Sequence, residues 1–341
     1  MPRLHFEDFS PGASAIHGPI RVTKDDMIAF AREYDPQPFH LDEEAAKGTF
    51  VGRLIGSGWH SCALTMRLIM PGLLADSSSM GAPGIDQVKW LRPVLPGDEL
   101  RLRYTIVDVR DSKSRPELGF VRFRFELLNQ ASDPALEQTN TIMFARRGAA
   151  AIPSLVPPPR PSDEPSPGMH LPNLDLAKRS IASPYLEDLV VGDVQELGSF
   201  TFSDEIIVDY ATKFDQQPFH MDAEAARHSL FGGLCASGWQ TGAVWMKLMV
   251  AYRERLNTEA LRRGERPARL GPSPGFKNLK WIKPVYAGDT ITYRSTVTGT
   301  RASATRPGWG LAFHHHKGFN QRDEEVFSYD GTVFWERRPK G

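Results

Sequence analysis

The chain has 341 residues, of which 40% are hydrophobic and 24% charged, and its basic and acidic residues are equal in number. This length and composition predict two domains with well-formed hydrophobic cores. Zero net charge argues against nucleic acid as a partner, because phosphate binding normally leaves a strong basic excess. No apolar run reaches the roughly 18 residues of a membrane span, so we expect no membrane association and a cytoplasmic location.

One stretch occurs twice in the sequence. Asp35-Pro-Gln-Pro-Phe-His40-Leu-Asp42 returns as Asp215-Gln-Gln-Pro-Phe-His220-Met-Asp222. The offset between the copies is 180 from Glu7 to Gly58 and 191 from Gly84 onward, because the second copy has 11 extra residues in between. A period this long predicts a duplicated domain rather than a solenoid. We predict an N-terminal domain at 1–148, a proline-rich extended linker at 149–183 and a C-terminal domain at 184–341.

The predicted elements follow the same order in each copy. A hydroxyl N-cap with acids after it, at Thr23 and Ser203, predicts helices over 25–34 and 204–214. The Asp-x-Gln-Pro stretch comes next and is expected on a loop, because proline restricts the residue before it. A glycine turn then starts an apolar helix at Gly58 or Gly238 that we expect to be buried on nearly all sides. In the second copy it should end near residue 252, with 253–269 as a solvated basic extension.

Strand patterns fill the remainder of each copy. Period-two alternation predicts strands over 100–109 and 121–127, a third strand lies near 139–145, and the second copy repeats them over 290–300, 311–319 and 331–335. A buried helix followed by antiparallel strands predicts an α+β unit whose sheet wraps the helix. Two such units can pair their sheets edge to edge, which also protects both edges.

Two aspartate–histidine pairs are the candidates for acid/base chemistry. Of the ten histidines, only His40 and His220 superimpose under the repeat, and each follows an aspartate, Asp35 or Asp215, by five residues. A histidine held beside an acid is a candidate general base. Capping of backbone groups in a tight loop is an equally good interpretation of these residue types alone.

The start of each apolar helix is the second candidate feature. Gly58 and Gly238 would present backbone N–H groups at a helix N-terminus, where roughly half a positive charge could hold an oxyanion. A tight turn followed by a core aromatic explains the same residues structurally.

Asp42 and Asp222 fit caps of short helices better than contacts to a substrate. The tract 314–316, three histidines, lies in a predicted strand, so we expect a solvated strand face rather than a metal site.

Together these motifs resemble the MaoC-like dehydratases, the (R)-specific enoyl-CoA hydratase group. The resemblance rests on Asp-x-Gln-Pro-Phe-His-x-Asp, on Ser-Gly-Trp and on Trp-Leu-Arg-Pro-Val-x-Pro-Gly-Asp, and it covers nearly the whole chain. It implies a tandem (double) hotdog fold, each unit an antiparallel sheet around a long central helix. It also implies a pseudo-dimer within one chain, with further dimerisation left open. The implied reaction is reversible hydration of a trans-2-enoyl thioester of CoA or acyl carrier protein, with no other cofactor.

The resemblance also assigns roles to residues. The residues that activate water and deliver the proton are Asp35, His40, Asp215 and His220. The candidates for oxyanion or substrate binding are Gly58, Gly238, Ser57, Ser237, Gln37 and Gln217. The two glutamines stand where the family usually has asparagine, which would shift that amide by one methylene. Because both pairs are intact, we predict two competent sites; the alternatives are a hotdog acyl-CoA thioesterase and a non-catalytic acyl-thioester binding protein.

Overall fold

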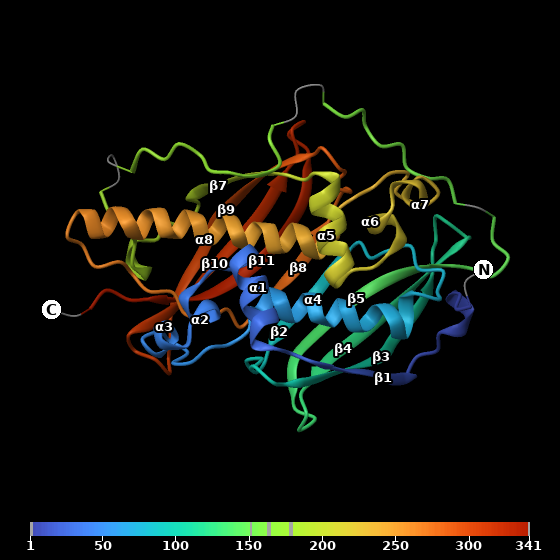
Figure 1. Cartoon of the computed structure of the whole chain (residues 1–341), viewed down its shortest axis with the longest axis horizontal. Helices are drawn as coiled ribbons and strands as arrows, with labels where there is room; N and C mark the ends of the chain where they lie inside the picture. Colours follow the sequence, from blue (N-terminus) through green and yellow to red (C-terminus); the bar gives the residue numbers. More distant parts are fainter. Residues whose placement is uncertain (1–2, 151, 162–164, 177–179, 340–341) are drawn as a thin grey trace.

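The computed structural model describes residues 3–150, 152–161, 165–176 and 180–339. Across these residues eleven strands form one antiparallel sheet, with the order β1-β3-β4-β5-β2-β8-β11-β10-β9-β7-β6. Apart from β6 at one end, the order is a mirror image about the β2–β8 pair, so the two halves of the chain contribute matching five-stranded sheets joined edge to edge. The long helices α4 and α8 lie side by side on one side of the sheet (Figure 1). The predicted α+β double hotdog is confirmed.

Each half contains the same elements in the same order. The helices of the first half are α1 (Lys24–Tyr34), α2 (Pro38–Leu41), α3 (Glu43–Lys47) and α4 (Gly58–Ile69), and its strands are β1 (Ser14–Arg21), β2 (Gly84–Trp90), β3 (Glu99–Asp111), β4 (Leu118–Leu128) and β5 (Pro134–Ala145). The helices of the second half are α5 (Asp204–Phe214), α6 (Pro218–Met221), α7 (Ala223–Arg227) and α8 (Gly238–Arg262), and its strands are β7 (Val194–Thr201), β8 (Gly275–Trp281), β9 (Thr290–Ala302), β10 (Trp309–Phe319) and β11 (Glu325–Glu336).

The two central helices are buried by the sheet and by each other. In α4 every residue except Gly58 and Arg67 is buried, as its apolar sequence predicts. One hydrophobic cluster contains residues of both halves, so the halves share a continuous core.

The helix α8 does not end near residue 252 as expected. It continues to Arg262 with Arg253, Leu256 and Ala260 buried, so the expected solvated extension over 253–269 is wrong for this part.

A pair of equivalent glycines allows the two halves to meet. A Cβ on Gly84 of β2 would lie 2.1 Å from the Leu279 carbonyl oxygen, and a Cβ on Gly275 of β8 would lie 2.1 Å from the Val88 carbonyl oxygen. No side chain fits at these distances. Both glycines are therefore required where β2 and β8 pair in the sheet.

Gly84→Ala is expected to lower the free energy of unfolding by about 1–3 kcal/mol, because the added methyl group forces the paired strands apart. A shift of the denaturant midpoint measures this effect. Gly308→Ala is the matched control, since a Cβ there meets nothing within 4 Å and its backbone carries no positive φ. An equal shift in both variants would contradict the steric explanation.

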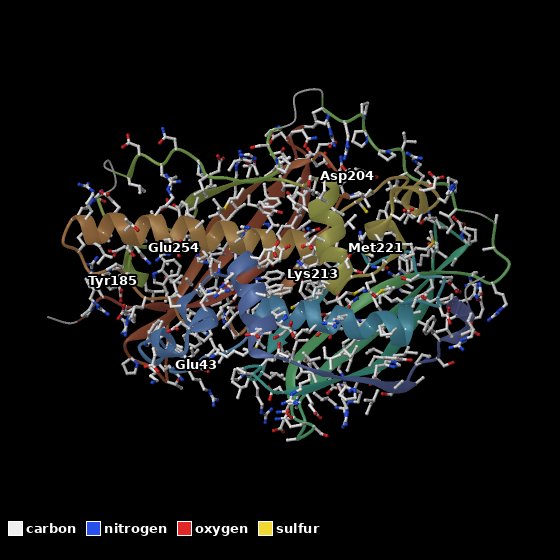
Figure 2. All side chains as sticks on the ribbon, viewed as in Figure 1. Glu43, Tyr185, Asp204, Lys213, Met221 and Glu254 are labelled. Atoms are coloured by element: carbon white, nitrogen blue, oxygen red, sulfur yellow. The ribbon has the colours of Figure 1, made fainter. Side chains whose placement is uncertain are left out.

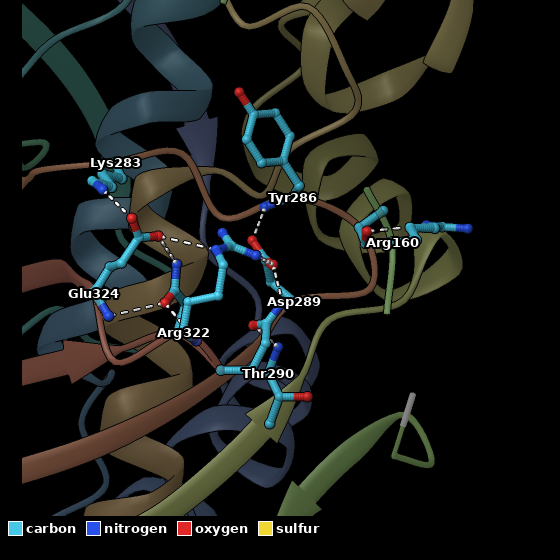
Figure 3. Close-up of polar contacts among 10 residues, drawn as sticks. Arg160, Lys283, Tyr286, Asp289, Thr290, Arg322 and Glu324 are labelled. Atoms are coloured by element: carbon cyan, nitrogen blue, oxygen red, sulfur yellow. Dashed lines mark hydrogen bonds and ion pairs between the residues drawn. The ribbon is translucent and has the colours of Figure 1, made fainter. Parts of the chain in front are cut away.

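Repeated acid and amide side chains fasten a turn in each half. Asp289 accepts hydrogen bonds from the Tyr286 N–H at 2.8 Å and from the Gln321 amide at 2.7 Å; Figure 3 shows this turn. Asp98 accepts from the Leu95 N–H and from Gln130 in the same way. The Gly-Asp and Asn-Gln repeats of the sequence thus hold the connections between β-strands.

The predicted linker 149–183 runs along the second half in its described parts. Gly168–His170 forms β6, which pairs with β7 at the end of the sheet. Residues 177–179, 162–164 and 151 of this segment lie outside the described residues.

No helix in the described part of the chain is both long and apolar enough to cross a membrane.

Candidate active site

Asp35 and His40 are brought together by two successive short helices. Asp35 caps the C-terminus of α1, with its N–H donating to the Ala31 carbonyl at 2.8 Å. Pro38 then starts α2, where proline suits the first helical position, and His40 lies in that single turn. The expectation that the whole motif lies on a loop is therefore wrong for His40. The His40 Nε2 atom lies 3.3 Å from Asp35 Oδ2, and both side chains are buried.

The other ring nitrogen of His40 determines which atom handles the proton. His40 Nδ1 lies 2.8 Å from the Ile55 carbonyl oxygen. A carbonyl can only accept, so Nδ1 carries the hydrogen and donates it. The Nε2 atom facing Asp35 is then the ring atom that can gain or lose a proton. The pair can share one proton between Asp35 Oδ2 and His40 Nε2.

Two further side chains hold the Asp35 carboxylate. The Ser57 hydroxyl donates to Oδ2 at 2.6 Å and the Gln37 amide donates to Oδ1 at 2.8 Å. Burial raises the pKa of Asp35, but the charge of His40 and the hydrogen bonds from His40, Ser57 and Gln37 outweigh it, so this pKa is lower than usual. The structure thus places Gln37 and Ser57, both predicted to bind substrate or an oxyanion, on the carboxylate of Asp35.

The second half repeats this geometry closely. His220 Nε2 lies 3.6 Å from Asp215 Oδ2, and His220 Nδ1 lies 2.7 Å from the Cys235 carbonyl oxygen. Ser237 and Gln217 donate to the Asp215 carboxylate at 2.6 and 3.0 Å. Burial lowers the pKa of His220, and the charge of Asp215 opposes this shift. Local geometry therefore does not distinguish the two pairs.

Each pair lies beside the N-terminus of a central helix. The Ser57 hydroxyl accepts a hydrogen bond from the Trp59 N–H at 3.2 Å and donates one to Asp35. One side chain therefore both caps α4 and positions the Asp35 carboxylate. The N–H of Gly58 is among the first amides of α4, which have no carbonyl partner within the helix. A Cβ on Gly58 would lie 2.6 Å from the Trp90 ring, so only glycine fits. The equivalent contact in the second half is Gly238 against Trp281 at 2.2 Å.

A large cavity opens onto the first pair. Its volume is about 900 Å³, within the range of small-molecule sites. Asp35, His40 and Gly58 line one end, and the wall continues along α8 and the strands β10 and β11 of the second half. This cavity does not contact Asp215, His220 or Gly238. An acid, a histidine and a free helix amide therefore face the same space in the first half.

At the second pair, the linker covers the loop that corresponds to a wall of the cavity. Residues 48–51 and 53 line the cavity, and their counterparts are 228–231 and 233. The Leu155 N–H donates to the Leu230 carbonyl at 2.7 Å, and the Ser154 hydroxyl donates to the Ser229 carbonyl at 2.6 Å. Arg160 anchors this stretch by donating to the Ala287 carbonyl at 3.1 Å (Figure 3). The linker thus makes the surroundings of the two sites different.

Two other sequence predictions have clear outcomes. Asp42 and Asp222 accept from the N–H groups of Ala45 and Ala225 at 2.7 Å, so they cap α3 and α7 as predicted. The expected solvated face over 314–316 is wrong. His314 and His316 are buried on the cavity wall, and His315 on the opposite face of β10 pairs with Asp330. These two residues of the cavity wall were therefore not predicted, although their counterparts Phe123 and Phe125 lie in a pattern predicted to bury one strand face.

Ser57→Ala is expected to raise the pKa of Asp35, because it removes a hydrogen bond that favours the carboxylate. If Asp35 must be ionised for activity, the acidic limb of the pH profile of kcat/KM moves to higher pH. Ser237→Ala removes the equivalent bond and the equivalent helix cap, so it should cost similar stability, about 1 kcal/mol. Unchanged acidic limbs in the Ser57 variant would contradict this role.

Comparison with known proteins places the chain in a family. The MaoC-like domain matches residues 8–121 and 191–308, more than half of the chain. The chain belongs to the MaoC-like domain family. It is 34% identical over 146 residues to the uncharacterised Bacillus subtilis protein YdeM, covering 42% of this chain and all of that protein.

Two further matches extend the comparison. Over 64 residues the chain is 34% identical to a mesaconyl-CoA hydratase of Cereibacter sphaeroides, which covers 19% of this chain and 18% of that enzyme. A conserved hypothetical protein of Mycobacterium tuberculosis with a double hotdog fold superimposes with a TM-score of 0.70 at 15% identity, covering 97% of this chain and 98% of that one. The family includes hydratases, and the solved structure supports the fold alone.

Proposed function

We propose that the chain catalyses reversible hydration of a trans-2-enoyl thioester to a 3-hydroxyacyl thioester at the site of Asp35 and His40. The observation that supports this most is the common cavity onto which the acid–histidine pair and the Gly58 amide open. The similarity to mesaconyl-CoA hydratase, though limited to part of that enzyme, points to the same reaction class.

The proposed reaction balances with the groups present. Asp35 and His40 hold a water molecule and accept one of its protons while its oxygen bonds to C3 of the substrate. The electrons of the C2–C3 double bond move to the thioester oxygen, and the Gly58 amide at the positive end of α4 stabilises that developing enolate. Collapse of the enolate takes a proton from the pair at C2. The pair ends with the number of protons with which it began.

An assay on the whole chain separates this reaction from the two alternatives. Hydration removes the conjugated double bond, so the enoyl-thioester absorbance should fall without release of free thiol. Thiol release at the same rate would indicate a thioesterase instead. Tight binding of acyl thioesters with neither change would indicate a binding protein and contradict the proposed hydration.

A further inference from the structure

The far part of the cavity contains a buried polar cluster formed by Arg253, His314 and His316. Their exposed fractions are 6%, 5% and 4%. All three line the same cavity as Asp35 and His40. The histidine rings stack with centroids 5.7 Å apart, and the Arg253 Cζ atom lies 4.6 Å from the ring centre of Trp335. We call these three residues the distal cluster.

A row of aromatic contacts connects the catalytic end to the distal cluster. Trp59, next to Gly58, lies 6.2 Å from Trp245, and Trp245 lies 4.4 Å from His316, measured between ring centroids. Along α8, Arg253 follows Trp245 by eight residues, which is about 12 Å at 1.5 Å per residue. Glu254, labelled on α8 in Figure 2, marks this position. An acyl group that starts at Gly58 and follows the cavity wall therefore points toward the distal cluster.

The first half of the chain shows that the fold does not need polar residues here. The counterparts of His314 and His316 are Phe123 and Phe125, which are buried apolar residues. Burying two imidazoles costs free energy that the phenylalanines avoid. Arg253 lies in the part of α8 that extends beyond the equivalent of α4, which ends at Ile69. The two histidines in place of phenylalanines are therefore best explained by something that the cavity binds.

Hydrogen-bonding groups without partners point to the same conclusion. Among the described residues, His316 Nδ1 and Trp245 Nε1 have no hydrogen-bond partner, and their side chains are more than nine-tenths buried. Such buried groups are rare in native proteins. Burial and the neighbouring Arg253 charge lower the pKa of His314 to about 4, so this histidine is uncharged at neutral pH. The Arg253 guanidinium supplies a positive charge, and the neutral imidazoles and the Trp245 N–H can supply hydrogen bonds. This combination is suited to binding an anion.

We infer that the distal cluster binds a carboxylate at the far end of the acyl group, so that the substrate is a thioester of an unsaturated dicarboxylic acid. This inference rests on the proposed hydration for its catalytic part. The phosphates of CoA are a second possible source of negative charge. They would lie at the mouth of the cavity, where Arg53 and Arg306 are exposed, and the distal cluster is buried. The carboxylate of the acyl group is therefore the favoured ligand.

The test compares two trans-2-enoyl-CoA substrates of equal length, one ending in a carboxylate and one in a methyl group. The wild type is expected to have the higher kcat/KM for the carboxylate, by at least about tenfold. Arg253→Leu, which removes the guanidinium and keeps a large side chain, should reduce that preference by about 10–100-fold, and Arg253→Lys should retain part of it. Arg262→Leu removes an exposed charge from the same helix and should leave the preference unchanged. A wild-type preference for the methyl end, or a preference that Arg253→Leu does not alter, would overturn the inference.

Two further measurements test whether the carboxylate binds independently of catalysis and whether Arg253 binds a phosphate of CoA instead. In the Asp35→Asn variant, calorimetry with saturated thioesters measures binding without turnover. A preference for the carboxylate there, with no hydration by the wild type, would support the inference while the proposed function fails. The N-acetylcysteamine thioesters lack the phosphates of CoA. If Arg253→Leu weakens both CoA thioesters equally and neither N-acetylcysteamine thioester, Arg253 binds phosphate and the inference is overturned.

Discussion

Asp35→Asn is expected to lower kcat/KM for the proposed hydration by about 100–10,000-fold, because it removes the proposed base of the site that faces the cavity. Asparagine has nearly the same shape, and its carbonyl oxygen can still accept the hydrogen bond from Ser57. Asp215→Asn is the matched variant in the second half, where Ser237 makes the same contact. It should leave kcat/KM close to that of the wild type. The measurement is the rate of absorbance loss of an enoyl thioester.

The double variant completes the comparison. If the first site alone is active, Asp35→Asn and the double variant should have the same residual rate. A loss of about half the rate in each single variant would instead show two working sites, as the intact motifs predict. Denaturant midpoints of all three variants provide the control, because an unfolded chain would lose activity for an unrelated reason.

The pairing of acid and histidine could be predicted from sequence because both residues belong to one short stretch, whereas the hydrogen bonds from Ser57 and Gln37 to Asp35 were not predicted. The N-caps, the proline and the serine–glycine turn fix where Asp35, His40 and Gly58 lie relative to one another. The same residues recur in the second half and give hydrogen bonds of nearly equal length. Repetition of a motif thus predicted that each aspartate–histidine pair lies beside the N-terminus of a central helix.

Which aspartate–histidine pair opens onto a cavity could not be predicted in this way. The cavity at Asp35 is bounded by α8, β10 and β11, which lie about 200 to 300 residues later in the sequence. Loop 228–233 is in turn covered by residues 154–157 of the linker, whose composition predicts only an extended chain. Two sites with the same local sequence therefore differ through contacts that only the folded chain brings together.

The β2–β8 pair, where the two half-sheets join, also could not be predicted in full from the sequence. The sequence predicted edge-to-edge pairing but not the strands that make it. The segment Gly84–Trp90 has no clear alternation, because Ile85 and Val88 are three residues apart and both are buried. A register shift between Ile85 and Gln87 in the β2–β5 pairing explains how both reach the core. Period-two rules fail at such irregularities.

Gly58→Ala is expected to lower kcat/KM by about 100-fold or more, because its methyl group would lie 2.6 Å from Trp90 and displace the helix amide or the cavity wall. Gly238→Ala makes an equivalent clash with Trp281 at 2.2 Å. Both variants should lose about 1–3 kcal/mol of unfolding free energy. Activity at a temperature where both remain folded should fall strongly in the first variant alone. Equal losses of kcat/KM would show that the clash acts through stability and not through the Gly58 amide, the proposed oxyanion donor.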